Sequence, residues 1–359
     1  MPESTRSSSG ADPHLWITVL AGGIGSRFWP ASTPTRPKQL LPLAGPRSLI
    51  ADTVARARAI AQDERICILA SAGLVGAFQA ALPDLGRDAY WVEPQARGTG
   101  PALAWAAWQA RRTDPDAVLL SLHSDHAIEP VEGFVAGARA AVELARRERA
   151  LVTIAVEPTR PETAYGYLRP GERLDPVEGI PTFRVGSFHE KPDRAAAERL
   201  IAEGFLWNSG IFAWRADVFL HELAQHAPGI AEPLRHLDAG DPEAFFAAAE
   251  SATVDESVLE RSERLAGIEA PFRWDDVGSW AGLARGTVPG ENVVVGPGHV
   301  VDGSDNVVYA EGGALVLWGL DDVVAVHTPG ATLVMRRELA PDLKRLLERL
   351  PDYLRETPR

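Results

Sequence analysis

The chain has 359 residues, of which 45% are hydrophobic and 24% are charged, a composition typical of a globular protein with a sizeable buried core. Its formal net charge of -13 at pH 7 argues against non-specific nucleic-acid binding or attachment to an anionic membrane as the main activity, because both need a basic surface. An anionic substrate would therefore have to meet a locally basic cleft.

The first 14 residues are polar and rich in serine, and they lack the apolar segment of a signal peptide. We predict that residues 1–14 form a mobile tail. No run approaches the roughly 20 apolar residues needed to span a bilayer. The single cysteine, Cys67, fits a reducing compartment. We therefore expect a cytoplasmic protein without membrane partners, with Cys67 buried in a strand.

Short apolar runs alternate with helical patterns over residues 15–156. This alternation indicates βαβ units and an α/β fold with a mostly parallel sheet flanked by helices. The expected strands cover residues 15–21, 66–70, 117–122 and 151–156, and the expected helices cover residues 48–61, 99–112 and 132–148.

Proline and glycine interrupt the pattern beyond residue 156. There we expect strands at 182–189 and 207–214 and helices at 193–203 and 241–250. From Asn292, short β runs separated by Gly, Asp and Asn turns predict a small sheet or an incomplete β-helix, followed by a terminal helix. The expected units are the tail 1–14, a large α/β domain 15–289 and a small β domain 290–359.

The first expected strand runs into the stretch LAGGIGSRFWP, residues 20–30. Glycines after a buried strand let backbone N–H groups turn toward an anion, and the start of a following helix would add its positive end. Phe28 excludes a GxGxxG dinucleotide fingerprint, and no GK[ST] follows as a Walker A loop demands. A plain strand-to-helix turn remains the alternative, although Arg27 and the nearby RPKQ favour an anion site.

Lysine is rare in this chain, with three among 36 basic residues. Two of the three, Lys38 in RPKQ and Lys191 in HEKPD, lie beside prolines in short polar motifs. Lysine and arginine do not present charge to phosphate in the same way. We interpret Lys38 and Lys191 as phosphate-binding residues, with solvated surface lysines as the alternative.

Two carboxylate positions are candidates for a metal site. Asp125 follows the strand 117–122 at its carboxyl end, where ligands of open α/β sheets gather, and Asp275 and Asp276 lie in FRWDDVGSW. If the two positions met opposite the glycine loop, they would hold Mg²⁺ on a nucleotide. Alone, each is equally typical of a cap or turn. We interpret His123 and His126 as packing or outer-sphere residues, because Mg²⁺ prefers oxygen ligands.

Taken together, the motifs resemble those of the mannose-1-phosphate guanylyltransferases, within the sugar-nucleotide pyrophosphorylase group. The resemblance spans about residues 15–350. In chain order the motifs are LAGGIGSRFWP, RPKQLL, EPQARGTGPA, SDHAI, YGYL, HEKP, WNSGIFAWR and WDDVGSW.

The resemblance implies a Rossmann-like nucleotidyltransferase sheet and a Mg²⁺-dependent reaction of α-D-mannose 1-phosphate with GTP, giving GDP-mannose and diphosphate. It also assigns residues by group. The catalytic residues would be Arg27, Lys38 and Lys191; the nucleotide-binding residues Ala21, Gly22, Gly23, Gly25, Ser26, Glu93, Arg97 and Thr99; the sugar-phosphate-binding residues Gly166, Glu190, Lys191 and Asn208; and the metal ligands Asp125 and Asp276.

The C-terminal segment resembles the short form of the family, without an isomerase domain, in which the β domain makes dimer contacts. This implies a homodimer with a single activity. Gly98 stands where the family usually has asparagine, so selectivity for guanine is less firmly implied than nucleotidyl transfer. The alternatives are a pyrophosphorylase for another hexose 1-phosphate or nucleotide, and a non-catalytic regulatory subunit that binds GDP-mannose.

Overall fold

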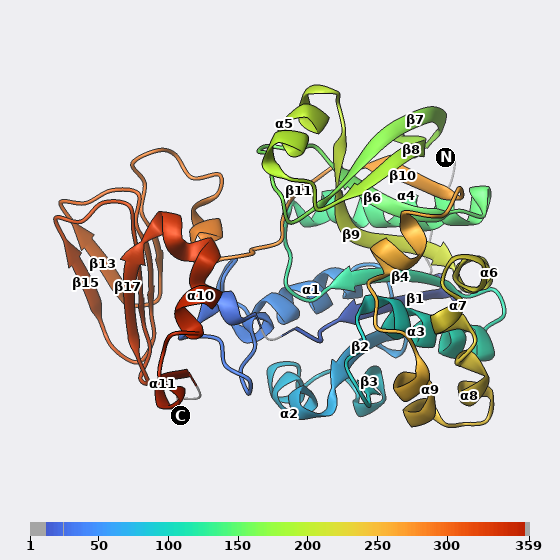
Figure 1. Ribbon diagram of the computed structural model, residues 1–359, viewed down its shortest axis with the longest axis horizontal. Coiled ribbons are helices and arrows are strands. Elements are labelled where there is room, and N and C mark those ends of the chain that lie inside the picture. The colour runs from blue at the N-terminus through green and yellow to red at the C-terminus, as the bar shows by residue number, and fades with distance from the viewer. Residues whose placement is uncertain (1–11, 24, 356–359) are drawn as a thin grey trace, which may run out of the picture.

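A nine-stranded sheet forms the centre of the larger domain in the computed structural model, which describes residues 12–23 and 25–355 (Figure 1). Its strands are β1 (Leu15–Leu20), β2 (Ile66–Ser71), β3 (Tyr90–Glu93), β4 (Val118–His123), β6 (Leu151–Val156), β7 (Gly166–Val177), β8 (Ile180–Glu190), β9 (Leu206–Arg215) and β10 (Leu265–Glu269). The spatial order is β3-β2-β1-β4-β9-β6-β10-β8-β7. Only β8 and β9 run against the rest of this sheet, which confirms the mostly parallel prediction.

Helices cover both faces of this sheet. On one face α1, α2 and α4 bury apolar side chains in a single core, and on the other face α3 and α6 to α9 do the same. The helices are α1 (Leu49–Arg58), α2 (Ala72–Ala81), α3 (Thr99–Thr113), α4 (Val131–Glu148), α5 (Arg194–Ala202), α6 (Ala216–His226), α7 (Pro228–Ala231), α8 (Leu234–Asp238) and α9 (Pro242–Ala248). No helix in the described ranges is long and apolar enough to cross a membrane.

The strands and helices predicted by residue range between residues 15 and 250 are all present, within a few residues. Cys67 lies in β2 and is 2% exposed, as expected. The sequence patterns missed α2, whose ten residues include two glycines, and β7, whose outer half is rich in charged residues. The antiparallel pair β7 and β8 extends one edge of the sheet.

The predicted N-terminal tail is too long. Residues 1–11 lie outside the described part, but Asp12 forms an ion pair with Arg146 at 2.5 Å and His14 Nδ1 contacts Asp114 Oδ2 at 2.8 Å. These contacts fasten residues 12–14 to the larger domain, so the prediction of a mobile tail is wrong for them.

The C-terminal domain stacks two ladders of short strands. The strands are β12 (Val293–Val295), β13 (Gly298–Val301), β14 (Val307–Ala310), β15 (Leu315–Trp318), β16 (Val323–His327) and β17 (Thr332–Arg336). Parallel pairing joins β12 to β14, β14 to β16 and β13 to β15, while β17 closes the sheet in the antiparallel direction. Parallel stacked ladders of this kind confirm a partial β-helix.

The predicted terminal helix is instead three short pieces. A 3₁₀ turn (Arg337–Asp342) is followed by α10 (Leu343–Leu347) and α11 (Asp352–Arg355). Pro341 lies inside the first piece and Pro351 precedes the last. Proline removes a backbone donor and clashes with the preceding turn, so it divides the helical pattern.

One hydrophobic cluster joins the two domains, and we call it the shared core. It lies where the C-terminal domain meets the blue N-terminal segment in Figure 1. The indole of Trp280 packs edge-on against Phe28, with ring centroids 4.9 Å apart, and against Tyr309 at 5.1 Å. Its Nε1 donates to the carbonyl oxygen of Trp29 at 3.1 Å. The loop after β1 is therefore held by residues from both domains.

Replacing Trp280, which is fully buried, tests the shared core. We expect Trp280→Ala to lower the free energy of unfolding by about 3–5 kcal/mol, because it leaves a large cavity. Urea unfolding followed by circular dichroism measures this loss. The control is Val288→Ala, since Val288 is 69% exposed and its substitution should cost under about 1 kcal/mol. Equal losses in the two variants would contradict a shared core.

Candidate functional site

A polar cavity of about 370 Å³ lies beyond the carboxyl ends of β1 and β4, where ligands of open α/β sheets usually bind. Both domains contribute to its wall. The lining residues are Gly25, Ser26, Arg27, Phe28, Lys38, His123, Asp125, His126, Asp276, Gly278 and Lys344. The structure thus brings together the glycine loop, Lys38 and both predicted metal carboxylates.

The glycine loop takes its shape from close packing against Lys38. Gly25 has φ +70, and a Cβ there would lie 2.3 Å from the Cβ of Lys38, so only glycine fits. A single 3₁₀ turn follows, Ser26–Phe28, in place of the expected helix. The prediction of a helix end facing the anion is therefore wrong. Phe28 is held in the shared core. Because a single turn replaces the expected helix, the positive charge of the cavity comes from side chains.

The remaining loop residues have separate contacts. Ala21 is fully buried, and the carbonyl oxygen of Gly23 accepts from the Gln39 side chain at 2.7 Å. Residue 24, within the predicted nucleotide loop 21–27, lies outside the described residues. Arg27 lines the cavity and donates through Nη1 to the carbonyl oxygen of Gly278 at 3.0 Å.

Lys38 links the two carboxylate segments although it is only 5% exposed. Its Nζ donates to Asp125 Oδ2 at 2.8 Å and to the backbone oxygen of Asp276 at 2.6 Å. Burial alone would raise the pKa of the Asp125 carboxyl, but the Lys38 ammonium and the neighbouring imidazoles lower it to about 2. Asp125 is therefore an anion at any physiological pH.

Asp276 is oriented by two donors. Tyr165 Oη and Arg285 Nη1 both donate to its Oδ1, the latter at 3.2 Å. Arg285 also pairs with Asp275 at 2.8 Å. Burial would lower the pKa of Arg285, yet the carboxylates around it raise the pKa above its usual range. Of the two adjacent aspartates, Asp275 is thus an ion-pair partner, while Asp276 lines the cavity.

The donor set fits a hard divalent cation. Asp125 Oδ1 and Asp276 Oδ2 accept no hydrogen bond from any described residue, which leaves one carboxylate oxygen on each side chain. Carboxylate oxygens are the protein ligands that Mg²⁺ prefers. A Cβ at Gly278 would lie 2.8 Å from Asp276 Oδ2, so glycine there keeps this oxygen accessible.

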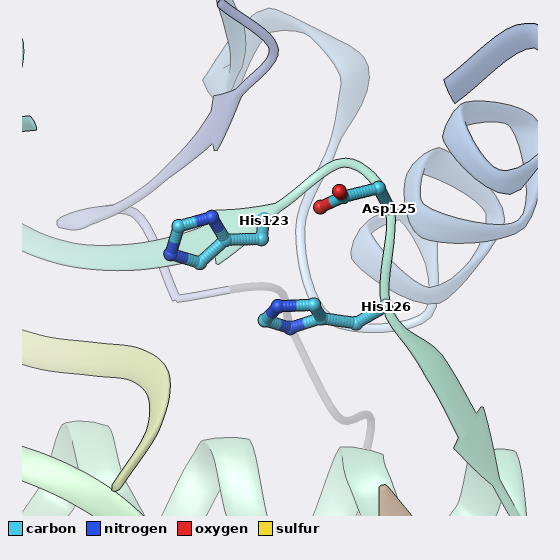
Figure 2. A group of neighbouring side chains, drawn as sticks. All are labelled: His123, Asp125 and His126. Atoms are coloured by element: carbon cyan, nitrogen blue, oxygen red, sulfur yellow. The ribbon is translucent and has the colours of Figure 1, made fainter. Parts of the chain in front are cut away.

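His123 and His126 form a close group with Asp125 in the turn after β4 (Figure 2). The two imidazoles stack with centroids 4.7 Å apart. Trp274 Nε1 donates to His126 Nδ1 at 3.0 Å, so neutral His126 carries its proton on Nε2 and has no free lone pair for a metal. Burial, and then His123, lowers the pKa of His126 well below its ordinary value. These contacts support a packing role for His126.

A second polar group contains the predicted sugar-phosphate residues. Lys191, whose φ of +46 is unusual for a non-glycine residue, donates to Glu190 at 2.7 Å. A Cβ at Gly166 would lie 2.7 Å from Glu190 Oε2. Asn208 donates to Asp255 at 2.8 Å. The structure thus places Gly166 beside Glu190 and adds Asp255 to the group.

Asp255 was missed by the sequence analysis. It begins a π-helical turn, Asp255–Leu259, a rare conformation often found at functional sites. Burial, and then the charge of Glu190, raises the pKa of the Asp255 carboxyl to about 7. The segment carries no repeat or metal-like spacing, so only the fold reveals its proximity to Asn208.

Glu93 lies at the end of β3 and is 9% exposed. A Cβ at Gly22 would lie 4.0 Å from its Oε1, which places the carboxylate beside the glycine loop. No described residue donates to this carboxylate, and burial raises its pKa to about 7. A buried acceptor without a protein partner is suited to bind donors of a ligand.

Arg97 and Thr99, also predicted to bind the nucleotide, contact another part of the protein. Arg97 donates through Nε to the carbonyl oxygen of Phe246 at 2.9 Å, and Thr99 Oγ1 accepts from the backbone N–H of Val254 at 2.9 Å. Between them, Gly98 has φ +85, and a Cβ would lie 2.5 Å from the Ala252 carbonyl oxygen. This close approach accounts for glycine at that position.

Two family models match this chain. Residues 17–288 match the nucleotidyl transferase family, and residues 298–350 match the MannoseP isomerase/GMP-like beta-helix domain. The mannose-1-phosphate guanylyltransferase of Escherichia coli (strain K12) is 34% identical over 95% of this chain and 74% of its own length. The xanthan biosynthesis protein XanB of Xanthomonas campestris pv. campestris (strain B100) is 35% identical over 92% of this chain and 72% of its own length.

A solved structure from Thermus thermophilus, described as a mannose-1-phosphate geranyltransferase, is similar over the whole architecture. Its TM-score is 0.86 at 31% sequence identity, covering 94% of this chain and 99% of that one. The similarity includes the C-terminal β domain, so both the large sheet and its appended domain are shared.

The raised pKa of Glu93 predicts a pH-dependent effect on stability. Between pH 4.5 and about 7 the folded state binds a proton that the unfolded state has released, so wild-type stability falls as pH rises through this window. Glu93→Gln does not titrate. We expect it to be more stable than wild type by about 3 kcal/mol at pH 8, with little difference at pH 4.5.

Urea unfolding at the two pH values measures the change. Glu232→Gln is the matched control, because Glu232 is exposed and makes no ion pair within the described residues. A stability gain for Glu93→Gln that is the same at pH 4.5 and pH 8 would contradict the raised pKa.

Proposed function

Because the chain belongs to the mannose-1-phosphate guanylyltransferase family of nucleotidyl transferases, we propose that it converts α-D-mannose 1-phosphate and GTP into GDP-mannose and diphosphate. The observation that carries this proposal is the cavity where Lys38 contacts both Asp125 and Asp276. It combines phosphate-binding cations with carboxylate oxygens and lies between the glycine loop and the C-terminal domain.

The reaction needs alignment and charge neutralisation more than a protein nucleophile. An oxygen of the sugar phosphate attacks the α-phosphorus of GTP in line, the bond to the β-phosphate breaks, and diphosphate leaves. Arg27 and Lys38 bind the triphosphate, and Lys191 binds the phosphate of mannose 1-phosphate. Lys38 is suited to this role because phosphate oxygens are acceptors of the same kind as its present partners.

Asp125 and Asp276 would hold a Mg²⁺ ion, which, when bound, supplies charge stabilisation to the phosphates. The fit rests on their two available carboxylate oxygens. Tyr165 and Arg285 hold Asp276 in one orientation, and Lys38 holds Asp125. The protein therefore fixes both ligands before the substrates arrive.

We assign specificity to two desolvated carboxylates, those of Glu93 and Asp255. Glu93 presents an acceptor to the N1–H and N2–H groups of guanine, whereas adenine has an acceptor at N1 and would be disfavoured. Asp255, together with Glu190 and Asn208, would accept from or donate to mannose hydroxyls. Both carboxyl groups have pKa values raised to about 7, so a ligand that donates to them recovers the free energy of their desolvation.

A homodimer would use the C-terminal domain. Val316 is 63% exposed and Trp318 is 76% exposed. The two residues are two positions apart in β15, so their side chains share one face of the strand. Exposed apolar side chains on a strand face are typical of a protein contact.

A substrate panel tests the proposed reaction. We expect diphosphate release to be fastest with mannose 1-phosphate and GTP, because Glu93 favours guanine. Diphosphate release is measured for mannose, glucose and N-acetylglucosamine 1-phosphates with GTP, ATP, UTP and dTTP. Equal turnover with glucose 1-phosphate would reject mannose selectivity. Absence of turnover with every pair would favour a non-catalytic subunit.

The adjacent aspartates provide a matched pair of variants for the metal site. We expect Asp276→Asn to lower turnover by roughly 10² or more, as for the loss of a major electrostatic stabiliser, and to raise the Mg²⁺ concentration needed for half activity. Asp275→Asn should cost less, since Asp275 pairs with Arg285. Steady-state rates across a Mg²⁺ titration measure both. Wild-type Mg²⁺ dependence in Asp276→Asn would refute its assignment.

A further inference from the structure

The third lysine of the chain, Lys344, lines the same cavity as Arg27 and Lys38. It belongs to α10 of the C-terminal domain, more than 300 positions from the glycine loop in the sequence. Two of only three lysines therefore face one cavity. Lysine presents its charge to phosphate on a long mobile stem, unlike the planar guanidinium of arginine.

The shared core fixes the backbone of Lys344 beside the glycine loop. Its neighbour Leu343 is 2% exposed and belongs to the same cluster as Phe28 and Trp280. Helix α10 also contacts the turn Ser26–Phe28 directly. The side chain of Lys344 thus starts from an anchored position and extends toward the cavity.

The charges of the cavity leave Lys344 available to an anion. Lys38 is engaged by Asp125, and Asp276 is paired with Arg285. The side chain of Lys344 makes no ion pair or hydrogen bond within the described part of the chain. Arg27 has only the Gly278 carbonyl as a partner among the described residues. Arg27 and Lys344, one from each domain, therefore bring positive charge to this wall that no carboxylate of the described residues pairs with.

We propose that Lys344 binds the β- and γ-phosphates of GTP, and hence the departing diphosphate, together with Arg27 and Ser26. This inference rests on the proposed function. Lys38 donates to the Asp125 carboxylate and to the backbone oxygen of Asp276 at the predicted metal site, and Lys191 lies in the sugar-phosphate group with Glu190. Lys344 borders the glycine loop instead, beside Ser26 and Arg27. The nucleotide site is then completed by the C-terminal domain.

Binding of inorganic diphosphate, measured by isothermal titration calorimetry in the presence of Mg²⁺, tests the inference on the full chain. We expect Lys344→Met to weaken diphosphate binding by about tenfold or more, because a charge-assisted hydrogen bond is lost. Lys344→Arg keeps the charge and should retain most of the affinity. The KM for GTP should rise in Lys344→Met in parallel, with the KM for mannose 1-phosphate unchanged.

The matched control is Arg345→Met, which removes a cation from the same helix. Arg345 contacts Asp342 at 3.5 Å and does not line the cavity, so its diphosphate affinity should equal wild type. The thermal unfolding temperature of each variant separates a binding effect from loss of fold. Wild-type diphosphate affinity in Lys344→Met, or an equal loss in Arg345→Met, would overturn the inference.

This experiment also distinguishes the inference from the proposed function. Diphosphate carries neither guanine nor mannose, so its binding does not depend on which nucleotide or sugar the enzyme uses. If wild type binds diphosphate but does not turn over mannose 1-phosphate with GTP, the proposed substrates are wrong while the role of Lys344 is still decided by the variants.

Discussion

The packing of Trp280 between Phe28 and Tyr309 is the interaction on which the cavity depends. Glycine-rich loops have high conformational entropy in the unfolded chain and need neighbours that fix them. Here the loop after β1 buries Phe28 and Trp29 against residues of the C-terminal domain, and Arg36 pairs with Glu311 at 2.6 Å. The small β domain thus helps to hold the glycine loop in its conformation.

Charge is concentrated locally by the same packing. A chain with a net charge of -13 must gather cations in one place to bind an anion. Lys38 is buried against Asp125, whose ionised form it stabilises, and Tyr165 and Arg285 orient Asp276. The carboxylates and cations are therefore pre-arranged by the fold, which reduces the reorganisation needed on binding.

Two carboxyl groups lie in surroundings that disfavour their ionised form. Glu93 and Asp255 are desolvated, and their pKa values are raised to about 7. Each lowers the stability of the folded protein at neutral pH. Such groups are more common at functional sites than elsewhere, because a ligand that donates to them offsets the cost. Glu93 lies beside the glycine loop, and Asp255 lies close enough to Glu190 to feel its charge.

The sequence by itself determined the α/β class, the main strands and helices, and the short β-strands of the last 70 residues. It also identified Lys38, Asp125 and Asp276 as candidate site residues. Apolar periodicity and turn residues act locally, so they can be read from the chain. Only the tertiary structure decided that Arg97 and Thr99 contact the 246–254 segment, that Asp255 lies beside Asn208, and that Lys344 lines the cavity. Those outcomes depend on contacts between residues tens to hundreds of positions apart, which no local pattern encodes.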